Sequence, residues 1–186
     1  MTVVKAALIG ATLTLAACGG SPDRFAVVPP VATETVRIGF RSVEVRDVSL
    51  PTYAAADEIS LQDADGRLVT EGDMLWADSP ERAVALEITR HLTQLTGARV
   101  ASDPWPFEGF PDARLEVRFE SLIAGTDGQF RTTGQYFVAV ANGRERAGLF
   151  ALAAPFDPEG GLPAIAQARG QIILQLATDI ARNGLR

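Results

Sequence analysis

Alternation of apolar and polar residues dominates the second half of this 186-residue chain and limits the folds open to it. Leu115, Val117 and Phe119 alternate with charged residues, and the run 130–140 keeps the same period. A period of two places one set of side chains on one face, so each stretch predicts a half-buried β-strand. Asn142-Gly143 is a strong hairpin signal, so we expect a partner strand over 146–156.

The first half of the chain carries the same kind of pattern. Val36, Ile38 and Phe40 alternate, and the run continues past them to about residue 48. Val43, Val45 and Val48 can share a face only if one residue is looped out, so this stretch predicts a strand with a bulge near Arg41-Ser42. The remaining strands are expected over 25–28, 58–62, 67–77 and 99–102.

Two stretches show the helical period instead. Val84, Ile88, Leu92 and Leu95 form an apolar stripe over about 79–97, where Ser79 is expected to cap the helix. A second stripe predicts a helix over about 163–183. Antiparallel strands with one apolar face and two amphipathic helices predict an α+β fold. Its two layers are a mainly antiparallel sheet and both helices packed on one face of it.

The N-terminus has the features of an export signal. Lys5 precedes an apolar run over 6–17, which is shorter than the roughly 20 residues of a membrane-spanning helix. Its end, Leu15-Ala16-Ala17-Cys18, resembles the lipobox of bacterial lipoproteins, in which the chain is cut before a cysteine that then carries acyl chains. We therefore expect a signal peptide over 1–17, an acylated cysteine and flexible tether over 18–34, and one periplasmic domain over 35–186.

Composition argues against several classes of function. Without Lys5 the chain has 16 arginines against 23 acidic residues, a net charge of −7, which disfavours nucleic-acid binding. The single histidine, His91, lies beside the apolar stripe, and we interpret it as a solvent-facing or rim residue rather than a catalyst. With Cys18 used by the anchor, no cysteine remains for a zinc site or a nucleophile. We expect no enzyme activity, no metal and no cofactor beyond the acyl anchor.

Aromatic residues outside the regular stripes are the candidate binding residues. They lie at a strand end (Trp76) and in the proline-rich stretch 104–111 (Trp105, Phe107 and Phe110). Core filling is the plainer interpretation of such residues. The alternative is an exposed apolar patch that docks a partner or lipid, for which prolines keep the loop stiff.

The order of several weak motifs resembles the ABC-type transport auxiliary lipoproteins, a family that includes the paraquat-inducible protein C type. The matching features are the lipobox, the segment 43–53 ending in Pro51-Thr52-Tyr53, Leu75-Trp76-Ala77-Asp78, and the loop Asp103-Pro104-Trp105. Two departures are visible, because Phe25-Ala26-Val27-Val28 replaces a Tyr-Tyr-x-Leu strand and Ala54-Ala55-Ala56 replaces a common arginine. Tyr53, within the matching segment, joins the candidate binding residues.

The resemblance implies a non-catalytic subunit of an intermembrane lipid transport system. Such a subunit would be lipid-anchored to the periplasmic face of the outer membrane of a Gram-negative bacterium, as Gly19 after the cysteine also implies. It would dock an MCE-domain transporter subunit, and homo-oligomerisation is compatible with it. Two other functions stay open, namely an assembly lipoprotein that binds another envelope protein and a carrier with its own hydrophobic cavity.

Overall fold

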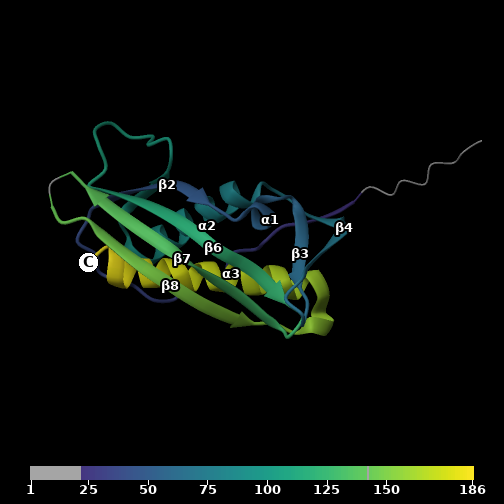
Figure 1. The fold of residues 1–186 in the computed structure, drawn as a ribbon. Helices are drawn as coiled ribbons and strands as arrows, with labels where there is room; N and C mark the ends of the chain where they lie inside the picture. Colours follow the sequence, from purple (N-terminus) through teal and green to yellow (C-terminus); the bar gives the residue numbers. More distant parts are fainter. Residues whose placement is uncertain (1–21, 142) are drawn as a thin grey trace, which may run out of the picture.

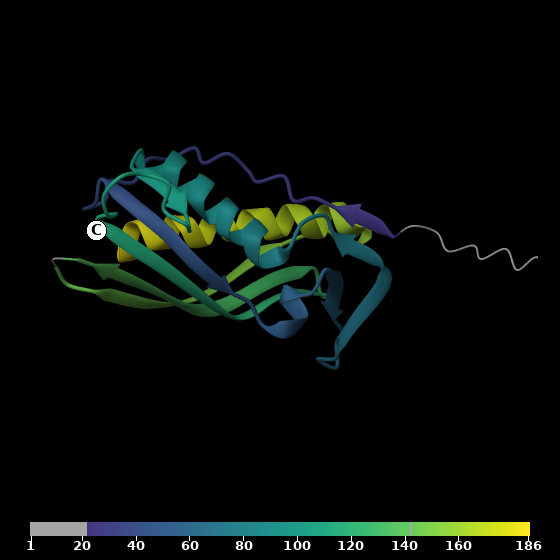
Figure 2. The ribbon, with the colours of Figure 1, turned by 90° about the horizontal axis from the view of Figure 1, so that it is seen from above.

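The computed structural model describes residues 22–141 and 143–186. They form a curved sheet whose one face is covered by both long helices, as Figures 1 and 2 show, and the predicted two-layer α+β fold is confirmed. The strands are β1 (Asp23–Phe25), β2 (Ser42–Ser49), β3 (Glu58–Gln62), β4 (Leu68–Trp76), β5 (Arg99–Ser102), β6 (Ala113–Gly125), β7 (Gln129–Val140) and β8 (Arg146–Pro155). The helical segments are α1 (Thr52–Ala55), α2 (Pro80–Thr96), η1 (Pro158–Gly160), α3 (Gly161–Asp179) and a π-helical turn, η2 (Ile180–Gly184).

Strand β6 is the centre of the sheet. One side of it pairs antiparallel with β7, which in turn pairs with β8. The other side is shared, because β2 pairs with the first half of β6 and β3 pairs with its end, both in parallel. The sheet is therefore mixed. The parallel neighbours β2 and β5 require a crossover connection, and α2 lies in it.

Strand β2 corrects the predicted position of the bulge. The register between β2 and β6 shifts between Val45 and Val48, not near Arg41-Ser42. This shift allows Val43, Val45 and Val48 all to be buried. The stretch before β2 does not join the sheet, because the Val36 N–H donates to the Leu95 carbonyl at the end of α2.

Both long helices follow the predicted apolar stripes. In α2, Pro80 occupies the first turn, and Gly97 ends the helix in the left-handed region at φ 65°. Ser79 stands at the cap position, but its side chain makes no capping hydrogen bond, contrary to our expectation. The end of α3 widens into the π-helical turn η2, where the Leu185 N–H donates to the Ile180 carbonyl five residues earlier.

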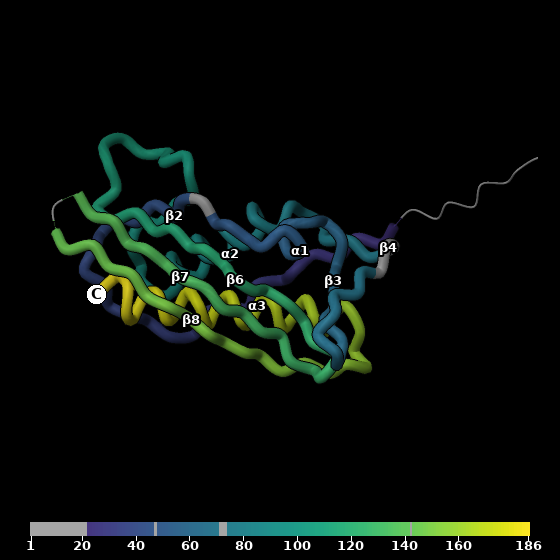
Figure 3. Tube along the Cα trace, viewed as in Figure 1, coloured from purple at the N-terminus to yellow at the C-terminus, as the bar shows by residue number. Residues whose placement is uncertain are grey.

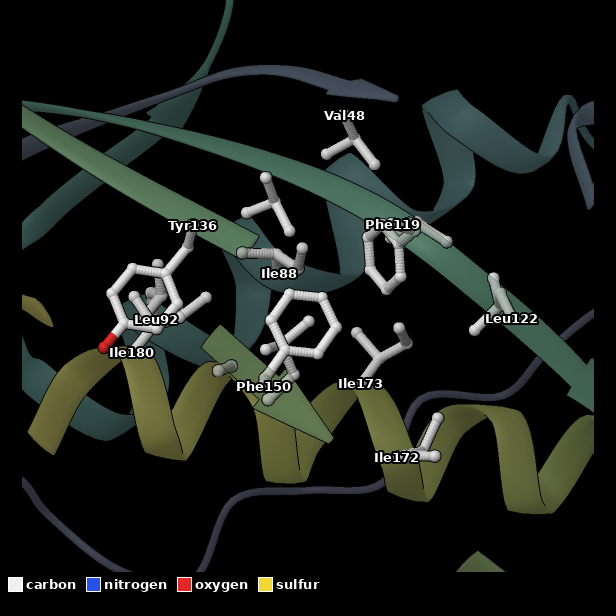
Figure 4. Packing of buried hydrophobic residues seen from close by; sticks show 14 of the residues in the cluster. Val48, Ile88, Leu92, Phe119, Leu122, Tyr136, Phe150, Ile172, Ile173 and Ile180 are labelled. Atoms are coloured by element: carbon white, nitrogen blue, oxygen red, sulfur yellow. The ribbon is translucent and has the colours of Figure 1, made fainter. Parts of the chain in front are cut away.

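The core lies between the helices and the long strands β6, β7 and β8. Figure 4 shows the Phe119 and Phe150 rings side by side above Ile173 of α3, and these two rings meet edge to face with centroids 5.3 Å apart. The predicted stripe residues Ile88 and Leu92 of α2 complete this cluster and are fully buried. Burial of this apolar surface is the main stabilising contribution to the fold.

The segment from β1 to β2 runs along the helical side of the molecule (Figures 2 and 3). Strand β1 pairs in parallel with the end of β4. Farther on, Val27 and Pro30 lie so close to Gly170 of α3 that a methyl group there would stand 3.1–3.3 Å from them. Residues 23–34, which we assigned to the tether, therefore contact the domain. Cys18 and the signal sequence lie outside the described residues.

Candidate functional site

The proline-rich stretch forms a loop, as predicted, at one end of the molecule (Figure 1). Both of its ends are fixed to β2. At the start, the Asp103 N–H donates to the Val45 carbonyl at 2.9 Å. At the far end, the Asp112 carboxylate accepts hydrogen bonds from the backbone N–H groups of Arg41 and Ser42 at 2.8 and 3.1 Å. Because both ends are held, the loop projects from the edge of the sheet in a fixed position.

Inside this loop Trp105 and Phe107 support one another. Their rings meet edge to face with centroids 5.0 Å apart, and the Arg99 guanidinium lies 5.0 Å from the Phe107 centroid. Trp105 is half-buried, and its indole N–H is buried without a hydrogen-bond partner. Phe107 remains 42% exposed. Trp105 thus stiffens the loop from within, while Phe107 presents part of its ring to solvent.

Phe110 is the most exposed large apolar side chain of this loop, at 85%. Its ring lies 5.9 Å from the Arg114 guanidinium, which in turn donates to the buried Glu44 carboxylate at 3.0 Å. Beside it is a groove of about 350 Å³ between the loop and the end of the β7–β8 hairpin. The groove is lined by Phe110, Pro111, Arg114, Ala139, Val140, Ala141 and Glu145. An exposed ring beside a groove is typical of a protein-binding surface.

The position of this aromatic loop relative to the N-terminal end is informative. Strand β1, at the purple start of the coloured ribbon, lies at one end of the long axis, and the loop lies at the other, in both views (Figures 1 and 2). Cys18 is four residues before residue 22, and four extended residues span at most about 14 Å. An anchor at Cys18 would therefore hold the β1 end near the membrane and point the aromatic loop away from it.

Tyr53 and Trp76 lie elsewhere, around a small cavity between α1, β3, β6 and α3. The Leu122 N–H donates to the Tyr53 hydroxyl oxygen at 3.3 Å, and Trp76 is 8% exposed. The cavity offers about 30 Å³ to the centres of water molecules, which is room for about two waters. The structure thus divides the five predicted binding residues between two places, and Trp76 belongs to the core.

A buried charged pair, which the sequence pattern did not reveal, borders this cavity. The Arg169 guanidinium of α3 donates to the Glu87 carboxylate of α2 at 3.3 Å and lies 4.7 Å from the Trp76 ring centroid. Burial raises the pKa of Glu87, and the attraction of Arg169 offsets only part of this. Burial also lowers the pKa of Arg169. The pair therefore joins the two helices at a cost in desolvation.

The interpretation of His91 as a solvent-facing residue is wrong, because its side chain is fully buried. His91 follows Glu87 by four residues, so the two side chains share the face of α2 that meets α3. Because α2 is covered by the sheet on one side and by α3 on the other, it has two buried faces. Burial lowers the pKa of His91, and both ring nitrogens lack hydrogen-bond partners among the described residues.

Within 22–141 and 143–186, His, Cys, Asp and Glu nowhere gather in a group of three that could hold a metal ion. In the same part of the chain, no helix has the length and apolar character needed to cross a membrane.

Comparison with known proteins gives the chain its relatives. The model of the ABC-type transport auxiliary lipoprotein component family matches residues 25–181. No curated protein matches the chain. The crystal structure of an uncharacterized protein is similar at a TM-score of 0.67, with 21% identity over 86% of this chain and 97% of that one. Protein XCC0632 from Xanthomonas campestris, assigned to the DUF330 family, is similar at 0.61, with 16% identity over 85% of this chain and 92% of that one. The chain belongs to the family of ABC-type transport auxiliary lipoprotein components.

Proposed function

We propose that this protein is the outer-membrane-anchored, non-catalytic subunit of an intermembrane lipid transport system, and that it docks an MCE-domain subunit through its aromatic loop. Family membership supports the general role as an auxiliary component of a transport system. The lipobox ending at Cys18 supports the anchor. The partner and the membrane follow from the family resemblance of the sequence and belong to the proposal.

The docking surface is inferred from one observation: the β1 end and the aromatic loop lie at opposite ends of the molecule. The β1 end is within about 14 Å of the anchoring cysteine, whereas Phe107 and Phe110 are exposed at the far end (Figure 1). A subunit held at one membrane meets a periplasmic partner with the end that faces away from that membrane. Aromatic side chains at that end supply apolar contact area at low cost in side-chain entropy.

The surface around Phe110 also defines the chemistry of the partner. Arg114 and Glu145 border the groove beside the ring, so polar groups surround an apolar centre. Such a surface fits a partner that inserts an apolar side chain and places polar groups at the rim. Anionic lipid is a poorer fit for this surface, because the protein carries an excess of negative charge.

Photo-cross-linking in the native envelope tests the proposal. A photoreactive phenylalanine analogue at position 110 of the full-length lipoprotein should cross-link an MCE-domain protein on illumination. The matched control is the same analogue at Leu68, an exposed apolar residue of the β3–β4 hairpin at the other end of the molecule. Cross-linking of the same protein from both positions, or of an unrelated envelope protein from position 110, would overturn the proposal.

A further inference from the structure

A second groove, of about 310 Å³, lies at the end of the molecule opposite the aromatic loop. It opens between the β3–β4 hairpin, the β6–β7 turn and the start of α3 (Figure 1). Its walls are formed by the side chains of Leu61, Met74, Phe156, Pro158, Leu162 and Ile165. None of the described residues that line it is charged, whereas Arg114 and Glu145 line the groove beside Phe110. We call it the apolar groove.

Backbone hydrogen bonds hold the walls of the apolar groove in place. The Thr126 N–H of the β6–β7 turn donates to the Gln62 carbonyl of β3 at 2.9 Å. The Phe156 N–H, just after β8, donates to the Gly128 carbonyl of the same turn at 2.8 Å. A groove formed in advance keeps its apolar lining in contact with water until an apolar group fills it, so filling it is favourable.

The size and the chemistry of the apolar groove limit what can fill it. Pockets for small molecules have volumes of about 300–1,000 Å³, and this groove is at the lower end of that range. It has room for part of one acyl chain rather than for a whole lipid with two chains. Because its lining offers no charged partner to a lipid headgroup, an uncharged hydrocarbon chain fits it best.

The protein itself brings such a chain close to the apolar groove. Asp23 of β1 pairs with Met74, which lines the groove. Cys18 precedes Asp23 by five residues, and five extended residues span at most about 18 Å. An acyl chain on Cys18 would thus be tethered beside the groove. Tethering makes its entry an intramolecular step at a high effective concentration, an advantage that a free lipid lacks.

We propose that the apolar groove holds one of the acyl chains attached to Cys18. This inference rests on the acylated cysteine of the proposed function and adds to it how the anchor meets the domain. An acyl chain gains nothing by leaving a bilayer for a groove that is equally apolar. The lining of the groove gains instead, because it loses its contact with water. The remaining acyl chains stay in the membrane and keep the protein attached to it.

The bound chain also restricts how the domain can turn. A single covalent link lets a domain rotate about its point of attachment. A chain in the apolar groove adds a second point of contact at the same end of the molecule, beside Met74 and Leu162. The β1 end is then held against the membrane, and the aromatic loop at the opposite end keeps pointing away from it (Figure 1).

Met74 allows a direct test, because the chain has only one other methionine, Met1, which lies in the predicted signal peptide. Growth with a diazirine analogue of methionine therefore puts one photoreactive group into the processed lipoprotein, at the wall of the apolar groove. Illumination of native envelopes should join position 74 to an acyl chain of Cys18 in the same molecule. After digestion with trypsin, mass spectrometry should detect the acylated peptide 18–24 linked to the peptide 68–82.

The matched control moves the methionine to another strand. Met74→Leu/Leu149→Met keeps one methionine in the processed chain and exchanges side chains of similar volume. It places the photoreactive group on β8, at a position that is 78% exposed. Linkage to the peptide 18–24 should be at least about tenfold weaker in this variant, because β1 tethers the acyl chain beside β4 and not beside β8.

Three other results would overturn the inference. They are a link from position 74 to a free phospholipid, a link to another protein chain, or no more linkage to the peptide 18–24 than in the control. The mass of the protein before illumination separates these failures from a failure of the proposed function. If Cys18 is acylated, any of the three results removes only the acyl chain from the groove. If Cys18 is not acylated, the anchor of the proposed function is contradicted as well.

Discussion

Glu87, His91 and Arg169 show where single residues depart from what a sequence pattern can predict. The stripe of α2 was predicted from spacing alone, and Ile88 and Leu92 are buried as expected. The same periodicity treats Glu87 and His91 as polar residues of the outer face. The burial of Glu87 depends on α3, because its partner Arg169 lies 82 residues farther along the chain. Long-range packing of this kind is invisible to a local period.

The buried pair yields a prediction for stability. Arg169→Met leaves the Glu87 carboxylate buried without a countercharge and should lower the free energy of unfolding by about 3–5 kcal/mol. The double variant Glu87→Leu/Arg169→Met should regain most of this loss, because it removes both charges. Chemical denaturation of the full-length protein measures both.

Arg118 supplies the control for this prediction, since it forms an exposed ion pair with Glu116. Arg118→Met should cost no more than about 1 kcal/mol. If Arg169→Met proved equally mild, the Glu87–Arg169 pair would not be the buried contact described above.

At the scale of elements, the strands and helices were largely predictable but their partners were not. Alternation located β3, β6 and β7, and the hairpin signal Asn142-Gly143 located β8. Nothing in the alternation distinguishes a parallel from an antiparallel neighbour, so the parallel pairing of β2 with β5 and β6 was missed. The first part of the long predicted strand, residues 36–40, fails for a related reason, because its backbone bonds to helix ends instead.

The aromatic loop depends on one element contact in particular, the bonds from Asp112 to the start of β2. Asp112→Ala removes the acceptor for the Arg41 and Ser42 N–H groups and should cost about 1 kcal/mol. Hydrogen exchange should then be faster at residues 41–42. Asp157→Ala is the matched control, because its carboxylate accepts a backbone N–H in η1 instead. Unchanged exchange in Asp112→Ala would mean that other contacts hold the loop.

At the scale of the whole molecule, the arrangement of the two ends gives the structure its functional meaning. The sequence indicated an anchor, a domain and an aromatic loop, but it could not place the loop relative to the anchor. That placement arises because residues 23–34 lie along the domain instead of extending freely. The reach of a free tether of about 15 residues, up to about 50 Å, thereby shrinks to about 14 Å for the four residues after Cys18.

The five predicted binding residues fall into two groups, which the structure places in different surroundings. Phe107 and Phe110 are exposed at the far end, and Trp105 supports them. Truncating Trp105 should therefore cost less than the about 3–5 kcal/mol of a fully buried tryptophan. Tyr53 and Trp76 border a small, partly open pocket. Sequence alone could not separate these cases, because an aromatic residue in a loop has the same pattern in a core and on a surface.

The most direct test of the docking account is the recovery of partners by a tagged full-length lipoprotein from its native envelope. The wild type should recover an MCE-domain protein. Phe107→Ser/Phe110→Ser should recover at most about a tenth as much, the loss expected when exposed aromatic anchors are removed. Its melting temperature should stay near that of the wild type. Equal recovery by the two proteins would show that the aromatic loop is not the docking surface.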